Sequence, residues 1–221
     1  MIHAEASELP RPSIDEVKKY LDIWENEKDN YEKMDKAIYH LIRQYPENKD
    51  INNVFLKCSV IDDIYHTRIS QYHNIYDLSE HILKKCVDEK LNGSDATVVD
   101  DIAEYKNSFS FATKFCSFHK PDQYPIYDSH VDNALKYFNK TYGKFADKIA
   151  INPYMNFKEV MDNFIKYFDL DQGNYCYGKY KAIDIYLWLV GKNELNKLKK
   201  NSKQSHYEPS PAASHNPLGN H

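Results

Sequence analysis

Helical periodicity is the feature that most constrains how this 221-residue chain can fold. Apolar residues recur at helical spacing along most of it. One such stripe is Val54, Cys58, Ile61 and Tyr65, whose offsets of 4, 3 and 4 place them on one face of a helix. Alternating patterns that indicate strands are nearly absent. The sequence therefore predicts an all-α fold, built as a compact multi-helix domain.

Capping and terminating residues set the expected helix boundaries. Ser13 followed by Glu16 forms a capping box, so a first helix is expected to begin there. Asp77 and Ser94 are each expected to cap a later helix. Further helices are expected from Ser108 to His119, from Ser129 to Asn139, from Asn156 onward and from Ala182 to Val190, with Gly191 ending the last.

The composition limits how many domains the chain can form and which partners it can bind. With 42% hydrophobic residues the chain can bury one sizeable core, and a single domain over residues 13–198 is expected. Residues 1–12 read as a flexible arm, and the Lys-rich, then Ser/Pro/Asn/His-rich stretch 199–221 as a disordered tail. A formal charge of -4 argues against a protein that coats nucleic acid through bulk electrostatics. Any contact with DNA must therefore be local.

The cysteines and the hydropathy pattern indicate the compartment. Four cysteines stand far apart without CxxC spacing, and no secretory leader or long apolar span precedes them. We therefore expect reduced thiols in a cytoplasmic protein without a membrane segment. The sequence suggests neither a metal site nor a cofactor.

The segment over residues 108–131 is the most informative for function. It reads as a helix, a loop containing Pro121 and Pro125, an acid and a second helix. The acid is Asp128, and a carboxylate at such a junction is well placed for chemistry. An Asp that precedes a helix can equally be a plain N-cap that accepts backbone N–H bonds.

This segment resembles the helix-hairpin-helix DNA glycosylases, in particular the 8-oxoguanine DNA glycosylase type. The resemblance is carried by Ala112-Thr113-Lys114 and by the run from Pro121 to Val131, and more loosely by the helical order across residues 50–192. In that family a DNA-gripping hairpin precedes a helix and then a Pro-containing loop that ends in an essential Asp. The resemblance assigns that role to Asp128. The stretch 105–109, where the family has a glycine-rich hairpin, contains no glycine.

The resemblance implies excision of a base flipped out of DNA, with a carboxylate stabilising the cationic sugar. Members that also cut the strand use an amine that forms a Schiff base, which points to Lys114, 14 residues before Asp128. A solvated or salt-bridged Lys114, with Asp128 activating water, is the alternative. The expected substrate-binding residues are His119, Tyr127 and His130 around the loop, and Thr67 and Arg68 near the flipped-base gap.

Two other functions stay open from the sequence. Arg68 and His73 resemble the R-x4-H motif of the HEPN ribonucleases, all-α proteins in which paired protomers cleave RNA. The chain could also be a non-catalytic nucleic-acid-binding relative of the glycosylase fold, in which Asp128 is purely structural.

Overall fold

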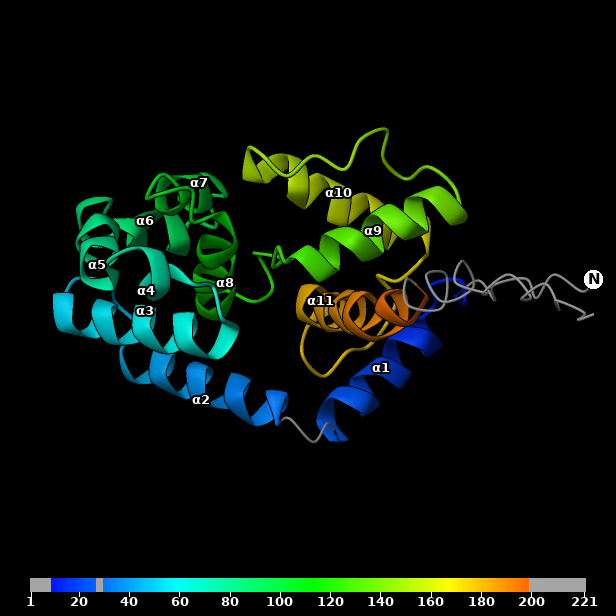
Figure 1. Ribbon diagram of the computed structural model, residues 1–221, viewed down its shortest axis with the longest axis horizontal. Coiled ribbons are helices and arrows are strands. Elements are labelled where there is room, and N and C mark those ends of the chain that lie inside the picture. Colours follow the sequence, from blue (N-terminus) through cyan, green and yellow to red (C-terminus); the bar gives the residue numbers. More distant parts are fainter. Residues whose placement is uncertain (1–8, 27–29, 199–221) are drawn as a thin grey trace, which may run out of the picture.

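The computed structural model describes residues 9–26 and 30–198. These residues form helices and no β-strand, which confirms the predicted all-α class (Figure 1). The helices are α1 (Ile14–Asn26), α2 (Tyr31–Gln44), α3 (Ile51–Tyr65), α4 (Ile69–Tyr72), α5 (Ile75–Lys84), α6 (Val87–Asn92), α7 (Thr97–Ala103), α8 (Phe109–His119), α9 (Ser129–Thr141), α10 (Tyr154–Tyr167) and α11 (Lys179–Leu189), followed by the π-helical turn η1 (Val190–Glu194).

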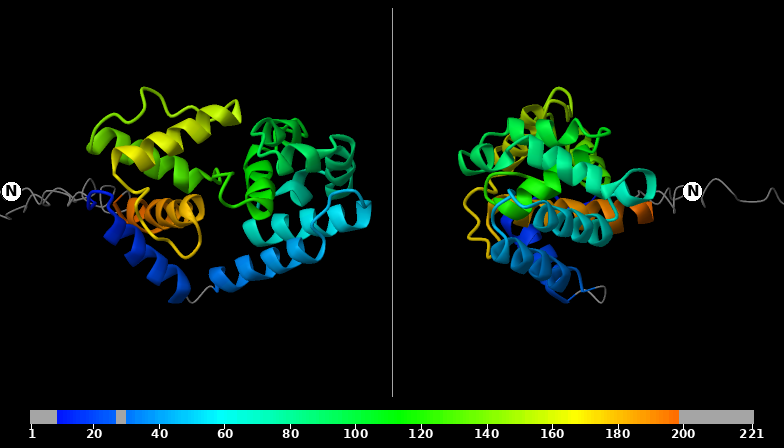
Figure 2. Two further views of the ribbon diagram at one scale, coloured as in Figure 1. Left: turned by 180° about the vertical axis from the view of Figure 1, so that it is seen from behind. Right: turned by 90° about the vertical axis from the view of Figure 1, so that its left-hand side faces the viewer.

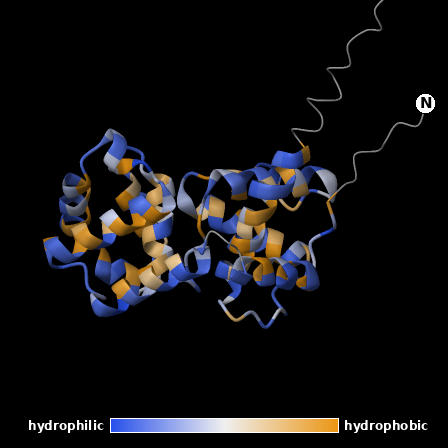
Figure 3. Cartoon of the chain, turned by 60° about the horizontal axis from the view of Figure 1, so that its bottom comes forward, coloured by the Kyte–Doolittle hydropathy of each residue, from blue (hydrophilic) through white to orange (hydrophobic). Residues whose placement is uncertain are grey.

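The helices lie in two groups. Figures 1 and 2 show α2 to α8 on one side and α1, α9, α10 and α11 on the other. In the first group α3 packs against α5 and α7 against α8, and in the second α1 and α9 pack against α11. The buried apolar side chains of both groups belong to one hydrophobic cluster, and Figure 3 shows apolar residues along the helices of both. The loop between α8 and α9 joins the groups.

Several boundaries agree closely with the sequence patterns. The Ser13 hydroxyl accepts the Glu16 N–H at 3.2 Å, as expected of a capping box, and four residues at helical spacing along α1 are buried. Those residues are Val17, Tyr20, Leu21 and Trp24. The helices expected over 108–119 and 129–139 are α8 and α9, each within two residues of the predicted bounds.

Two predicted caps are wrong. Asn74, rather than Asp77, caps α5, because its extended backbone lets its side chain accept the Tyr76 N–H at 2.8 Å. Ser94 has a left-handed backbone with φ 57°, which forms the turn ahead of α7 rather than its cap. The side chain of Asp95 accepts the Thr97 N–H instead, at 2.9 Å.

Two further boundaries need correction. The helix expected from Asn156 begins at Tyr154, whose N–H donates to Asp100 at 3.0 Å. Gly191 does not end the last helix, because the chain continues through η1. A Cβ at Gly191 would lie 2.2 Å from the carbonyl oxygen of His130, so glycine here permits close packing of η1 against the start of α9.

The start of the described chain is tied to the second helix group. The Leu9 N–H donates to the Tyr137 hydroxyl at 2.9 Å, and the Arg11 guanidinium lies 4.9 Å from the centre of the Phe168 ring. The tail predicted over 199–221 and most of the predicted arm lie outside the described residues. In residues 9–26 and 30–198, no helix combines the length and apolarity needed to cross a bilayer.

Candidate functional site

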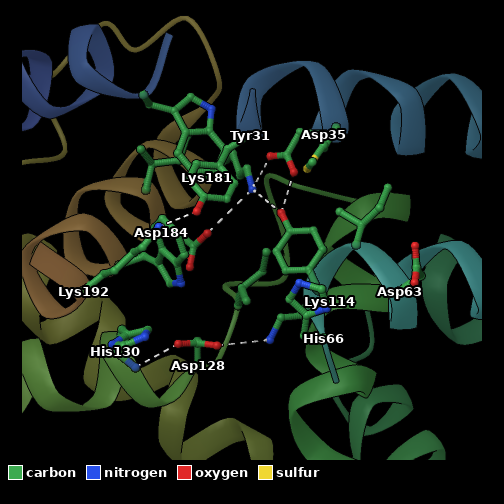
Figure 4. A pocket seen from close by; sticks show the side chains of 17 residues that line it. Tyr31, Asp35, Asp63, His66, Lys114, Asp128, His130, Lys181, Asp184 and Lys192 are labelled. Carbon is green, nitrogen blue, oxygen red and sulfur yellow. Dashed lines mark hydrogen bonds and ion pairs between the residues drawn. The ribbon is translucent and has the colours of Figure 1, made fainter. Parts of the chain in front are cut away.

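Lys114 and Asp128 meet where the two helix groups face each other. Lys114 is only 1% exposed, since α8 is buried on nearly all sides. Its Nζ lies 3.6 Å from Asp128 Oδ2 (Figure 4). It also donates to the Ser110 hydroxyl at 2.7 Å and to the Tyr127 carbonyl oxygen at 3.2 Å. These contacts hold the amine in a fixed position beside the carboxylate.

Asp128 both caps a helix and faces the amine. Its Oδ1 accepts the His130 N–H at 2.8 Å at the start of α9, and its Oδ2 is the oxygen closest to Lys114. The side chain is 22% exposed. The capping role expected from the sequence therefore leaves one carboxylate oxygen available for chemistry.

Both residues line a cavity of about 560 Å³, a volume typical of small-molecule sites. Its walls come from both helix groups. The side chains that line it are Trp24, Tyr31, Met34, Asp35, Asp63, Ile64, Tyr65, His66, Lys114, Ile126, Asp128, His130, Lys181, Asp184, Ile185, Trp188 and Lys192. Figure 4 shows Lys114 and Asp128 on one side of this space and Asp184 and Lys192 on another.

One wall of the cavity is aromatic. Trp24 and Tyr31 are stacked with ring centres 5.4 Å apart, and Trp188 meets both edge-on at 5.9 and 5.1 Å. The His130 ring lies 6.1 Å from Trp188. Such π faces favour a planar ligand, because a nucleobase stacks on aromatic side chains without needing specific hydrogen bonds.

A buried ionic cluster forms the far end of the cavity. Lys181 of α11 lies 2.7 Å from Asp35 Oδ2 of α2 and 3.7 Å from Asp184. The Tyr65 hydroxyl donates to the other Asp35 oxygen at 2.5 Å. This cluster links α2, α3 and α11 across the two helix groups.

Burial shifts the proton affinities of these groups in different directions. It lowers the pKa of Lys114, although the charge of Asp128 opposes the shift. Burial by itself would lower the pKa of Lys181 as well. The negative charges of Asp35 and its neighbours outweigh this effect, so the pKa of Lys181 lies well above its ordinary value. Burial raises the pKa of Asp184 to about 7. A lysine with a lowered pKa carries more of the neutral, nucleophilic amine at neutral pH.

The other residues expected to bind substrate fall in different places. His130 lines the cavity. Tyr127 contributes its carbonyl oxygen to Lys114, while its ring packs against Phe109 and Phe157. His119 is not among the residues lining the cavity, because its ring belongs to a separate buried polar cluster with Lys57 and Asn48.

Thr67 and Arg68 also lie outside the cavity lining. Together with His73 and Lys106 they line a separate hollow of about 160 Å³. That hollow adjoins the turn between α7 and α8, where Lys106 and Asn107 have left-handed backbones with φ 52° and 57°.

Comparisons with known proteins identify a family. Residues 16–123 match the model of HI_0787_N, described as an N-terminal domain. An "uncharacterized protein" from Haemophilus influenzae is 35% identical over 158 residues, which cover 67% of this chain and 71% of that relative. The chain belongs to the HI_0787 family. No solved structure matches it.

The HI_0787_N match spans only part of the site. It runs from α1 to the loop after α8 and includes Trp24, Asp35 and Lys114. Asp128 and the α11 wall lie beyond it.

The aromatic wall and the ionic cluster were missed from the sequence. Residues 182–190 read only as a buried apolar helix, yet Asp184 is a charged position within it and Lys181 immediately precedes it in the same helix. Two buried charges in a mostly apolar helix indicate a site, because buried charges are rare unless they are paired or functional.

Proposed function

We propose that this HI_0787 family member is a DNA glycosylase that excises a damaged base through a Schiff base on Lys114. One observation carries the proposal: the buried Lys114 amine lies 3.6 Å from Asp128 Oδ2 in the wall of a cavity of about 560 Å³. An amine, a carboxylate and an aromatic wall are the groups this reaction needs. The resemblance of residues 108–131 to the helix-hairpin-helix glycosylases supports the same reaction.

Each group has a role that follows from its surroundings. A flipped base enters the cavity and stacks on the ring of Trp188, with Trp24 in the same wall. As the glycosidic bond weakens, positive charge develops on the sugar, and the Asp128 carboxylate stabilises it. The neutral Lys114 amine attacks C1′ of the sugar and forms the covalent intermediate. Ser110 and the Tyr127 carbonyl oxygen orient the amine for that attack.

A local basic hollow supports contact with the DNA backbone despite the overall charge of -4. Arg68, His73 and Lys106 line it beside the turn that precedes α8. Phosphate contacts of this kind fix the register of a protein on DNA and make the affinity depend on salt. The hollow shares Ser110 with the surroundings of Lys114, so a strand held there passes close to the cavity.

The test is borohydride trapping on a panel of duplexes, each with a single 8-oxoguanine, hypoxanthine or uracil. Wild-type protein is expected to yield a covalent protein–DNA adduct with at least one duplex. Lys114→Gln is expected to yield none, while Lys158→Gln, on α10 outside the cavity lining, traps as the wild type does. Release of base without any adduct would favour water activated by Asp128. No release and no adduct from any duplex would refute the proposal.

A second candidate is the HEPN-type ribonuclease. The observation that favours it is that Arg68 and His73 line the same hollow, at the two ends of α4. A ribonuclease of that type would lose RNA cleavage on His73→Ala and would behave as a dimer in solution. A glycosylase would retain base release in the same variant and lose only affinity for the duplex.

A further inference from the structure

Asp184 is a carboxyl group that the reaction above leaves without a role. It enters the cavity from α11, a different element from those that carry Lys114 and Asp128 (Figure 4). It is only 6% exposed, so solvent does not compensate its charge. A buried carboxyl in a ligand cavity is costly to keep ionised and is well suited to hold a proton.

The groups that face Asp184 come from four elements. Lys181 is on its own helix at 3.7 Å, and the charges of Asp35 on α2, Lys114 on α8 and Asp128 at the start of α9 also act on it. Lys181 lies closer to Asp35, at 2.7 Å, than to Asp184. The carboxylates of Asp35 and Asp128 disfavour a further negative charge on Asp184. Lys181, the nearest cation, pairs mainly with Asp35. Asp184 is thus the acid of the cavity best placed to be neutral.

Both oxygens of Asp128 face N–H groups of the protein. Oδ1 accepts the His130 N–H, and Oδ2 faces the Lys114 amine. Asp128 is therefore arranged to stabilise positive charge rather than to donate a proton. A base that leaves as an anion needs a proton from another group.

We propose that Asp184 is the acid that protonates the departing base, an inference that rests on the proposed glycosylase function. The C1′–N bond breaks, and its electron pair leaves with the base. Asp184 gives its proton to that base and becomes a carboxylate, while the neutral Lys114 amine forms the new bond to C1′. The resulting ammonium passes one proton to O4′ as the sugar ring opens to the protonated Schiff base. Asp184 regains a proton from water after the base leaves.

The protonation of Asp184 sets the expected pH dependence. Burial raises the pKa of Asp184 to about 7, with Lys181 and Lys114 opposing and Asp128 and Asp35 adding to the shift. The acid form is therefore present below pH 7 and is lost above it. Release of a neutral base should slow as the pH rises through this range.

The experiment compares two substrates under single-turnover conditions. The first substrate comes from the panel of 8-oxoguanine, hypoxanthine and uracil duplexes, and is the one whose base the wild type releases fastest. The second is the same duplex with an abasic site in place of the damaged base, so it has no base to protonate. Asp184→Asn is expected to slow base release by about 100-fold or more and to flatten its decline above pH 7. The same variant is expected to keep borohydride trapping on the abasic duplex. Asp162→Asn, on α10 outside the cavity lining, provides the control for the substitution itself.

The outcomes separate this inference from the proposal on which it rests. Equal losses on both duplexes would mean that Asp184 only maintains the cavity, and undiminished base release would mean that it donates no proton. Either result overturns the role of Asp184 while the glycosylase function stands. Wild-type protein that neither releases a base nor traps an abasic site overturns both.

Discussion

At the scale of single residues, Asp128 combines two functions that a substitution can separate. Asparagine is as good an N-cap as aspartate, so Asp128→Asn should keep the bond to the His130 N–H and shift the thermal midpoint by less than about 2 °C. Loss of the negative charge beside the developing cation should slow base release by about 100-fold or more. Thermal unfolding and single-turnover excision measure the two effects. A large fall in the midpoint without any loss of activity would make Asp128 a purely structural cap.

His119 gives a pH prediction for stability. Burial lowers the pKa of His119 to about 4, so the folded protein binds fewer protons than the unfolded chain between about pH 4 and 6.5. The contribution of His119 to the free energy of unfolding is therefore complete above pH 6.5 and is lost as the pH falls toward 4. From pH 7.5 to 5 the loss due to His119 should be about 2 kcal/mol.

Urea unfolding at the two pH values measures this loss. Between the two pH values His119→Gln should lose about 2 kcal/mol less stability than the wild type, because the opposing gain from proton binding by Asp184 is common to both proteins. His40→Gln, at an exposed position of α2, should follow the wild type. An acid-induced loss that is the same in wild type and in His119→Gln would contradict the assignment.

At the scale of elements, the approach of η1 to α9 determines where Asp128 stands. A Cβ at Gly191 would meet the backbone of His130 at 2.2 Å, so Gly191→Ala must push the start of α9 away. We expect a cost of about 1–3 kcal/mol in the free energy of unfolding and slower base release, since Asp128 immediately precedes that helix. Chemical denaturation and excision assays test this.

The matched control is Gly93→Ala. A Cβ at Gly93 meets nothing closer than the Glu89 carbonyl oxygen at 3.4 Å, and its φ of -77° suits alanine. That variant should be unchanged or more stable by up to about 1 kcal/mol. Equal effects of the two substitutions would show that the contact at Gly191 is unimportant.

The elements also show what the sequence could supply. The periodicity predicted α1, α3, α8 and α9 closely, because their apolar stripes and caps are local signals. Asp77 and Ser94 failed as caps, because several polar residues compete at each helix start and only the backbone conformation decides among them. Gly191 was wrongly predicted to end its helix. It is a glycine because the backbone of α9 packs closely against it, and a sequence alone does not distinguish such a glycine from one that terminates a helix.

At the scale of the whole molecule, the Lys181–Asp35 pair links α11 to α2 across the two helix groups. Removing one partner leaves a buried charge without its counterion, so Lys181→Met should cost about 3–5 kcal/mol. The double variant Asp35→Leu with Lys181→Met should be more stable than Lys181→Met alone. The exposed pair Lys19 and Glu16 should contribute no more than about 1 kcal/mol.

Unfolding free energies of the single and double variants form a double-mutant cycle for the pair. Strictly additive losses would contradict a direct interaction between Asp35 and Lys181.

The assembled cavity explains why only part of the site was predictable. Lys114 and Asp128 lie in one continuous segment, so a local resemblance can bring them together. Trp24, Lys181 and Asp184 reach the same cavity from α1 and α11, and their proximity depends on how the two helix groups meet. His119 is close to Asp128 in the sequence but points into another part of the molecule. It follows Phe115 by one helical turn and therefore lies on the same face of α8 as Phe115.

The central claim is that Lys114 is the nucleophile, and peptide mapping of the borohydride-reduced protein–DNA adduct tests it most directly. Three lysines line the cavity in the described part of the chain, namely Lys114, Lys181 and Lys192. After nuclease and protease digestion, mass spectrometry should find the sugar remnant on Lys114. A remnant on Lys181, on Lys192 or on the protein surface would contradict the claim.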